Sequence, residues 1–113
     1  MPDARPPWYM REAVDLLRRA VDVLDTARAP RRRLEGAFHE LSQLAFDDLS
    51  QGPLSAQFHA LRGAIKRAPE GDDGTHAASV AAMTDAEVQE EMDRIRALYA
   101  AMRLEWDAAR GKT

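Results

Sequence analysis

The residues best suited to bind an anion are three consecutive arginines, Arg31, Arg32 and Arg33, directly after a proline. The proline predicts that a helix starts here, so the arginines occupy its first turn. A helix N-terminus carries partial positive charge and prefers acidic residues, which makes this cluster unfavourable for its own helix. Arginines beside free backbone N–H groups are typical of an anion or phosphate site. The cluster is therefore a candidate partner-binding site, unless Asp22 or Asp25 simply neutralises it.

The same predicted helix contains RRRLEGAFHE, in which five residues separate Arg33 from His39. This spacing is similar to the R-x4-6-H motif of the HEPN family of helical-bundle ribonucleases. The resemblance implies a small helical bundle in which Arg32 or Arg33 acts with His39 on an RNA phosphate at a dimer interface. Six positions rotate a helix by about 240°, however, which aligns Arg32 and Glu35 with His39 better than Arg33. The alternative is a surface row of Arg, Glu and His side chains.

The chain has three histidines, His39, His59 and His76, and no cysteine. None of the histidines shows the H-x3-H or E-x-x-H spacing that zinc and di-iron sites use. The lack of cysteine excludes disulfides and thiolate chemistry. A glycine-rich phosphate loop and a local Ser, His and Asp signature are also missing from the sequence. We therefore expect no metal and no cofactor, and the sequence favours a protein that is not an enzyme.

A second candidate for partner binding is the acidic stretch at residues 70–76. Its candidate residues are Glu70, Asp72, Asp73 and His76. The connection over residues 69–83 is long, and structureless loops of such length are usually functional or disordered. We expect the run THAASVAAM to form a short extra helix, with Val80 and Met83 packed against the core. The alternative is that the acidic stretch is only a connection.

Residues 69–99, from PEGDDGTHAASVAAMTDAE through IRALY, resemble a group of small uncharacterised bacterial helical proteins. Those proteins read approximately P-x-E-G-D-E-G-[ST], then A-[ST]-V-x-x-M-[ST]-D-E-E, then a leucine-rich helix with a Leu-Tyr pair. Before this segment the resemblance is loose, because those proteins have a charged helix where this chain has LSAQFHALRGAIKR. The resemblance implies that residues 69–87 connect two helices, and it implies no activity and no catalytic residue.

Apolar spacing and helix-breaking residues predict four helices, at about residues 7–28, 31–49, 53–68 and 84–110. Apolar side chains repeat every three or four positions, and a proline stands at or beside each of the first three starts. No run alternates β-branched and aromatic residues with polar ones, so no strand is expected. The predicted fold is an all-α antiparallel four-helix bundle forming one domain over residues 1–113. In that topology Trp8 and Trp106 lie at one end, where we expect them to close the core with Tyr9.

The last predicted helix has the clearest start in the chain. Thr84 and Glu87 match a T-x-x-E capping box, and Met83 and Val88 are placed for the hydrophobic staple across it. Heptad spacing then continues for three repeats. This helix should therefore be longer than its neighbours.

Composition restricts the class of protein. The hydrophobic fraction of 45% and the charged fraction of 31% are typical of a globular domain, and no apolar run approaches the ~20 residues of a membrane span. The start MPDARPPWYM lacks the basic end and apolar core of a secretory signal, so a cytoplasmic location is expected. Basic residues that are mostly arginine, together with many alanines, suggest a bacterial origin.

The first third of the chain is basic, while the rest is acidic. Residues 1–33 carry eight arginines against five acids, a net charge of +3, whereas residues 34–113 have a net charge of −6. Nucleic-acid binding through the basic third is one alternative, but the acidic remainder argues against it.

The first and last predicted helices carry more apolar surface than a four-helix monomer of this size needs. The surplus predicts an interface, either with a protein partner or between copies of this chain. The sequence therefore favours a non-enzymatic helical interaction protein, and the alternative is a HEPN-like RNA-cleaving or RNA-binding bundle.

Overall fold

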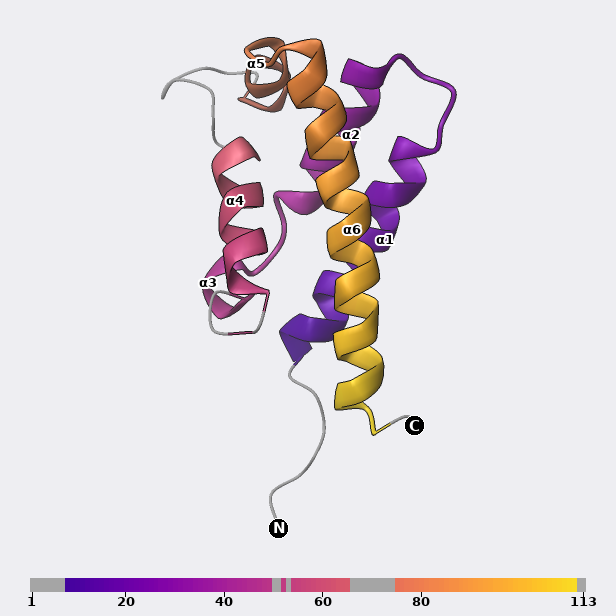
Figure 1. Ribbon diagram of the computed structural model, residues 1–113, viewed down its shortest axis with the longest axis vertical. Helices are drawn as coiled ribbons and strands as arrows, with labels where there is room; N and C mark the ends of the chain where they lie inside the picture. The colour runs from indigo at the N-terminus through magenta and orange to yellow at the C-terminus, as the bar shows by residue number, and fades with distance from the viewer. Residues whose placement is uncertain (1–7, 50–51, 53, 66–74, 112–113) are drawn as a thin grey trace.

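The computed structural model describes residues 8–49, 52, 54–65 and 75–111, and every regular element in these ranges is a helix. As Figure 1 shows, they are α1 (Trp8–Leu24), α2 (Pro30–Leu41), α3 (Phe46–Leu49), α4 (Ser55–Ile65), α5 (Thr75–Ala81) and α6 (Asp85–Ala109). The all-α fold class is confirmed, and the antiparallel four-helix arrangement stays a prediction. None of these described helices has both the length and the apolar character needed to cross a membrane.

The centre of the core lies between α1, α2 and α6. α1 packs most extensively against α2 and α6, and α6 runs antiparallel beside it (Figure 1). Ala13, Leu17, Ala20 and Leu24 of α1 are completely buried, because their spacing of three or four positions places them on one face. α4 contacts α6 and α5 beside this centre, and the short α3 packs against α4.

α1 and α2 approach each other closely at Gly36. A Cβ atom added there would lie 2.7 Å from Cγ1 of Val23, closer than carbon atoms of neighbouring side chains approach in folded proteins. Glycine is less favourable than alanine inside a helix by about 1 kcal/mol. The close packing of the two helices accounts for a glycine in the middle of α2.

The prediction of one continuous helix over residues 31–49 is wrong. α2 ends at Leu41, and a turn precedes α3. The hydroxyl of Ser42 donates a hydrogen bond of 2.7 Å to the carbonyl of His39, and serine side chains that bond nearby carbonyls compete with helix continuation. Leu44 in the turn is still buried. The apolar pattern therefore predicted burial here while misplacing the end of the helix.

The first predicted helix, at residues 7–28, is also longer than the helix that forms. α1 ends at Leu24, and the hydroxyl of Thr26 donates a hydrogen bond of 2.7 Å to the carbonyl of Val23. Ala29 is then extended, with φ −58° and ψ 149°. It precedes a proline, whose ring disfavours the helical conformation in the residue before it.

The short extra helix predicted within THAASVAAM is confirmed as α5, with Val80 and Met83 buried. Ser79 of α5 is completely buried, and its hydroxyl donates a hydrogen bond of 2.9 Å to the carbonyl of Ile65 at the end of α4. This bond attaches α5 to α4. The predicted third helix over 53–68 corresponds to α4, and its predicted ends lie outside the described residues.

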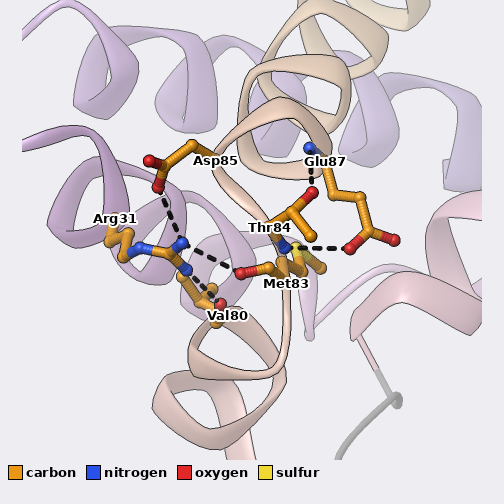
Figure 2. Close-up of polar contacts among 6 residues, drawn as sticks. All are labelled: Arg31, Val80, Met83, Thr84, Asp85 and Glu87. Carbon is orange, nitrogen blue, oxygen red and sulfur yellow. Dashed lines mark hydrogen bonds and ion pairs between the residues drawn. The ribbon is translucent and has the colours of Figure 1, made fainter.

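The capping box at the start of α6 is confirmed. The Thr84 hydroxyl accepts a hydrogen bond of 3.1 Å from the Glu87 N–H, and the Glu87 carboxylate accepts one of 2.9 Å from the Thr84 N–H (Figure 2). Met83 and Val88, the predicted staple residues, are both buried. α6 then continues for 25 residues, the longest of the described helices.

Trp8 does not close the core as the sequence predicted, because it is 65% exposed. Nine positions separate Trp8 from the buried Leu17, a rotation of about 180° around the helix, so the two side chains leave α1 on opposite faces. Tyr9 and Trp106 are partly buried against the core. Of the three aromatic residues expected at this end, only these two pack.

Candidate functional site

Arg31 joins three elements at one end of the molecule. Its guanidinium donates hydrogen bonds of 2.7 Å to the carbonyl of Val80 and 2.9 Å to the carbonyl of Met83, and it lies 2.8 Å from a carboxylate oxygen of Asp85 (Figure 2). Val80 belongs to the last turn of α5, Met83 to the connection and Asp85 to the first turn of α6. This candidate for partner binding is therefore engaged within the fold, where it clamps α2 to α5 and α6.

The clamp accounts for the unfavourable charge at the start of α2. The last carbonyls of a helix have no partner within that helix and carry partial negative charge. Arg31 meets such a carbonyl at the end of α5, while Asp85 places a negative charge where the N-terminus of α6 favours one. A charge that is unfavourable for its own helix thus becomes favourable at the end of another.

Arg33 has the same role at the end of α1. Its Nη1 donates a hydrogen bond of 2.9 Å to the carbonyl of Leu24, the last residue of α1. Arg96 of α6 reaches the same carbonyl at 3.5 Å and forms an ion pair of 2.7 Å with Asp25. Arg32 is exposed and forms neither a hydrogen bond nor an ion pair with the residues that the structure describes. Of the three arginines, only Arg32 is left available to a partner.

His39 and His76 meet where α2 packs against α5, with ring centroids 6.0 Å apart and ring planes at 79°. His39 is exposed in the last turn of α2, whereas His76 is half-buried. The described contacts join His39 to His76 and do not join it to Arg32 or Arg33, so they give the ribonuclease interpretation no support. The other candidates of the acidic stretch, Glu70, Asp72 and Asp73, lie outside the described residues.

Burial lowers the pKa of His76, and the nearby His39 lowers it further. The Nδ1 atom of His76 is buried and has no hydrogen-bond partner among the described residues. A partly buried imidazole resists protonation, because its charged form loses hydration and finds a second imidazole instead of a carboxylate nearby. The lowered pKa of His76 therefore predicts that the stability of the fold depends on pH.

The folded state should lose stability as the pH falls below about 6.5, because the unfolded chain then binds the proton that folded His76 resists. The contribution is present above the unfolded pKa and is lost as the pH falls towards the lower, folded pKa. We expect His76→Gln to flatten the pH dependence of the melting temperature, and His39→Gln to flatten it less. Circular dichroism melts between about pH 5 and 7 measure this. His59→Gln, at an exposed position on α4, is the control, and equal slopes for His76→Gln and wild type would contradict the prediction.

A shallow groove runs between the first half of α1 and the last half of α6. It consists of two adjoining cavities of about 410 and about 310 Å³. Its lining residues are Arg11, Val14, Asp15 and Arg18 from α1, Tyr99, Arg103, Trp106 and Asp107 from α6, and Arg110 at the C-cap of α6. This feature, hereafter the α1–α6 groove, combines charged rims with aromatic and aliphatic walls.

Two arginines of the α1–α6 groove lie over its aromatic rings. The guanidinium of Arg103 is 5.9 Å from the ring centroid of Tyr99, and that of Arg110 is 5.5 Å from the ring centroid of Trp106. Arg103 also donates a hydrogen bond of 3.1 Å to the Tyr99 hydroxyl. Cation–π contacts of this kind position a guanidinium while leaving its N–H groups able to bind an anion.

The outward face of the same half of α6 is apolar and uncovered. Leu104 is 72% exposed, and Ala97, Ala100 and Ala108 are exposed around it. These four residues are three or four positions apart and therefore share one face of the helix. We call this surface the α6 outer face; whether it is the apolar surplus expected for the first and last helices stays a prediction.

Sequence reasoning missed the arginines of the α1–α6 groove. The sequence does contain a pattern that indicates them: Arg11 and Arg18 are seven residues apart, and Arg96, Arg103 and Arg110 have the same spacing. A spacing of seven places side chains on one face of a helix. Their meeting in one groove, however, depends on how α1 and α6 align.

In the described ranges, no group of three or more His, Cys, Asp or Glu side chains could hold a metal ion. No protein-family model, curated protein or solved structure matches the chain. The functional assignment therefore rests on the α1–α6 groove and the α6 outer face.

Proposed function

We propose that this protein is a non-enzymatic interaction protein, which binds another helical protein or a second copy of itself through the α6 outer face. The observation that supports this is Leu104, which is 72% exposed at the centre of that face. A single exposed leucine is ordinary on a protein surface. Here the exposed alanines extend the apolar surface along the helix on both sides of Leu104.

The α6 outer face is suited to a second helix. Alanine side chains are small and let another helix approach closely, while the leucine provides apolar surface for it to cover.

Leu104→Glu is expected to weaken self-association by at least about tenfold, because burying a leucine contributes about 1.5–3 kcal/mol. A carboxylate at this position would also have to lose its hydration. Sedimentation equilibrium over a range of concentrations measures the effect. Ala56→Glu adds the same charge at an exposed position on α4 and should leave association unchanged.

Two results would count against this function. A wild-type chain that sediments as a 12.6 kDa monomer at every concentration excludes the self-associating form. Equal association of Leu104→Glu and Ala56→Glu excludes the α6 outer face as the interface. Circular dichroism checks that both variants keep the helical content of the wild type.

The scaffold that we propose for this role is the antiparallel four-helix bundle, with α1, α2, α4 and α6 as its helices and α3 and α5 as short additions. The proposed setting is the bacterial cytoplasm, where the protein acts as an accessory subunit without a cofactor. A ribonuclease role, implied by the HEPN resemblance, stays a prediction. It needs an arginine acting with His39, and the described contacts of Arg33 are directed to the end of α1 instead.

A further inference from the structure

The α1–α6 groove brings like charges together in a regular register. The ion pair of 2.7 Å between Asp25, directly after the end of α1, and Arg96 of α6 shows how the two antiparallel helices align. Seven residues further along each helix, Arg18 of α1 stands opposite Arg103 of α6, and both line the same cavity. Asp25 and Arg96 are thus an attractive pair, whereas the pair seven residues away, Arg18 and Arg103, consists of two cations.

A further shift of seven residues along both helices places Arg11 opposite Arg110, and both line the adjoining cavity. Each facing pair therefore consists of two like charges, and an anion lying between them would be attracted by both. Asp15 and Asp107 also line the groove, and the negative charge of Asp107 interacts favourably with Arg103. Four guanidiniums and two carboxylates leave the groove with a net charge of +2, in a chain whose net charge is −3.

We propose that the α1–α6 groove binds an acidic helix of a protein partner, and that each pair of facing arginines holds one carboxylate between them. This rests on the proposed interaction function and adds the chemistry of the partner. Two guanidiniums that line the same cavity can both donate charge-assisted hydrogen bonds to one carboxylate placed between them.

The spacing of the arginine pairs favours a helix as the occupant. The pairs are seven residues apart on both α1 and α6, which corresponds to about 10.5 Å along a helix. A partner helix repeats the same face every seven residues, so its acidic side chains at positions i and i+7 meet both pairs. Phosphates of a nucleic acid strand follow each other at shorter intervals. Phosphates between the two pairs would face Asp15 and Asp107, which repel them.

The test uses the fluorescence of Trp106, which lies in the groove beneath Arg110. Trp8→Phe, at the exposed start of α1, makes Trp106 the only tryptophan and supplies the background for all measurements. The probe is a synthetic alanine-based helical peptide with two glutamates seven residues apart. A second peptide of the same composition, with the glutamates on adjacent positions, tests the spacing. We expect the first peptide to bind more tightly than the second, and added salt to weaken its binding.

Arg18→Glu and Arg18→Gln are each expected to weaken binding of the first peptide by about tenfold or more, because each removes one guanidinium from a pair. Arg19→Glu is the matched control: the residue is exposed on the same helix and lines neither cavity, so its variant should bind as the parent does. Circular dichroism checks that all variants are folded.

Three results would overturn the proposal: no binding of the first peptide at low salt, equal binding by the Arg18 and Arg19 variants, or tighter binding of a thymidine oligonucleotide or inorganic phosphate than of the peptide. The Leu104→Glu experiment measures self-association by sedimentation, so its result does not depend on peptide binding to the groove. Self-association through the α6 outer face with no peptide bound to the groove would remove this proposal and leave the proposed function intact.

Discussion

Arg31→Ala is expected to lower the free energy of unfolding by about 2 kcal/mol, although Arg31 lies in the first turn of α2 at the surface of the molecule. The substitution removes the hydrogen bonds to the carbonyls of Val80 and Met83 and the ion pair with Asp85. Most of the loss should come from the two carbonyls, which are left without the guanidinium. Asp85 is 98% exposed, and exposed ion pairs contribute at most about 1 kcal/mol.

Urea unfolding followed by circular dichroism measures this loss. Arg32→Ala is the matched control, because Arg32 is exposed next to Arg31, and it should change stability by no more than about 0.5 kcal/mol. Asp85→Asn keeps both carbonyl contacts and should have less effect than Arg31→Ala. Arg31→Lys should be intermediate, since an ammonium lacks the planar fork that reaches two carbonyls. If Arg31→Ala and Arg32→Ala unfold at the same urea concentration, the clamp does not stabilise the fold.

Phe38→Ala should have a still larger effect, about 3–5 kcal/mol, because the ring is completely buried and its removal leaves a cavity. Domains of this size are stable by only about 5–15 kcal/mol. The variant should therefore unfold at much lower urea concentration and melt at much lower temperature than the wild type.

Phe46→Ala provides the comparison for Phe38→Ala within the same residue type. Phe46 is only partly buried, on the short α3, where the guanidinium of Arg62 lies 5.8 Å from its ring centroid. Its loss should reduce stability by about 1–2 kcal/mol. If Phe46→Ala lowers the free energy of unfolding as much as Phe38→Ala does, α3 belongs to the centre of the core, and the core is not confined to α1, α2 and α6.

The predictions for stability and for binding concern opposite ends of α6. Arg31 and the capping box fix the first turn of α6 against α5 and α2 (Figure 2). The α1–α6 groove and the α6 outer face belong to its second half, which in Figure 1 extends away from α5 along α1. One end of the helix is therefore fixed by polar contacts to α2 and α5, while both proposed binding surfaces lie along its other half. Substitutions at Arg18 or Leu104 should change binding with little effect on the anchored end.

Local chemistry accounts for what could be predicted from the sequence. The capping box of Thr84 and Glu87 needs only residues three positions apart, and the short helix α5 and the burial of Val80 and Met83 follow from apolar spacing. The break after Leu41 was missed because apolar spacing continues through the turn, while the competing hydrogen bond comes from a single serine side chain.

The sequence by itself determined the all-helical class, the start of α6 and the extra helix α5, because each follows from residues within a few positions of one another. Only the tertiary structure decided the roles of the arginines. Arg31 and Arg33 looked like an anion site because their own helix disfavours them, yet they bind the carboxyl ends of α5 and α1. The facing pairs of the groove likewise exist only once α1 and α6 align. The groups that an arginine contacts come from residues distant in the chain. Only the packing of the helices brings these groups to the arginine.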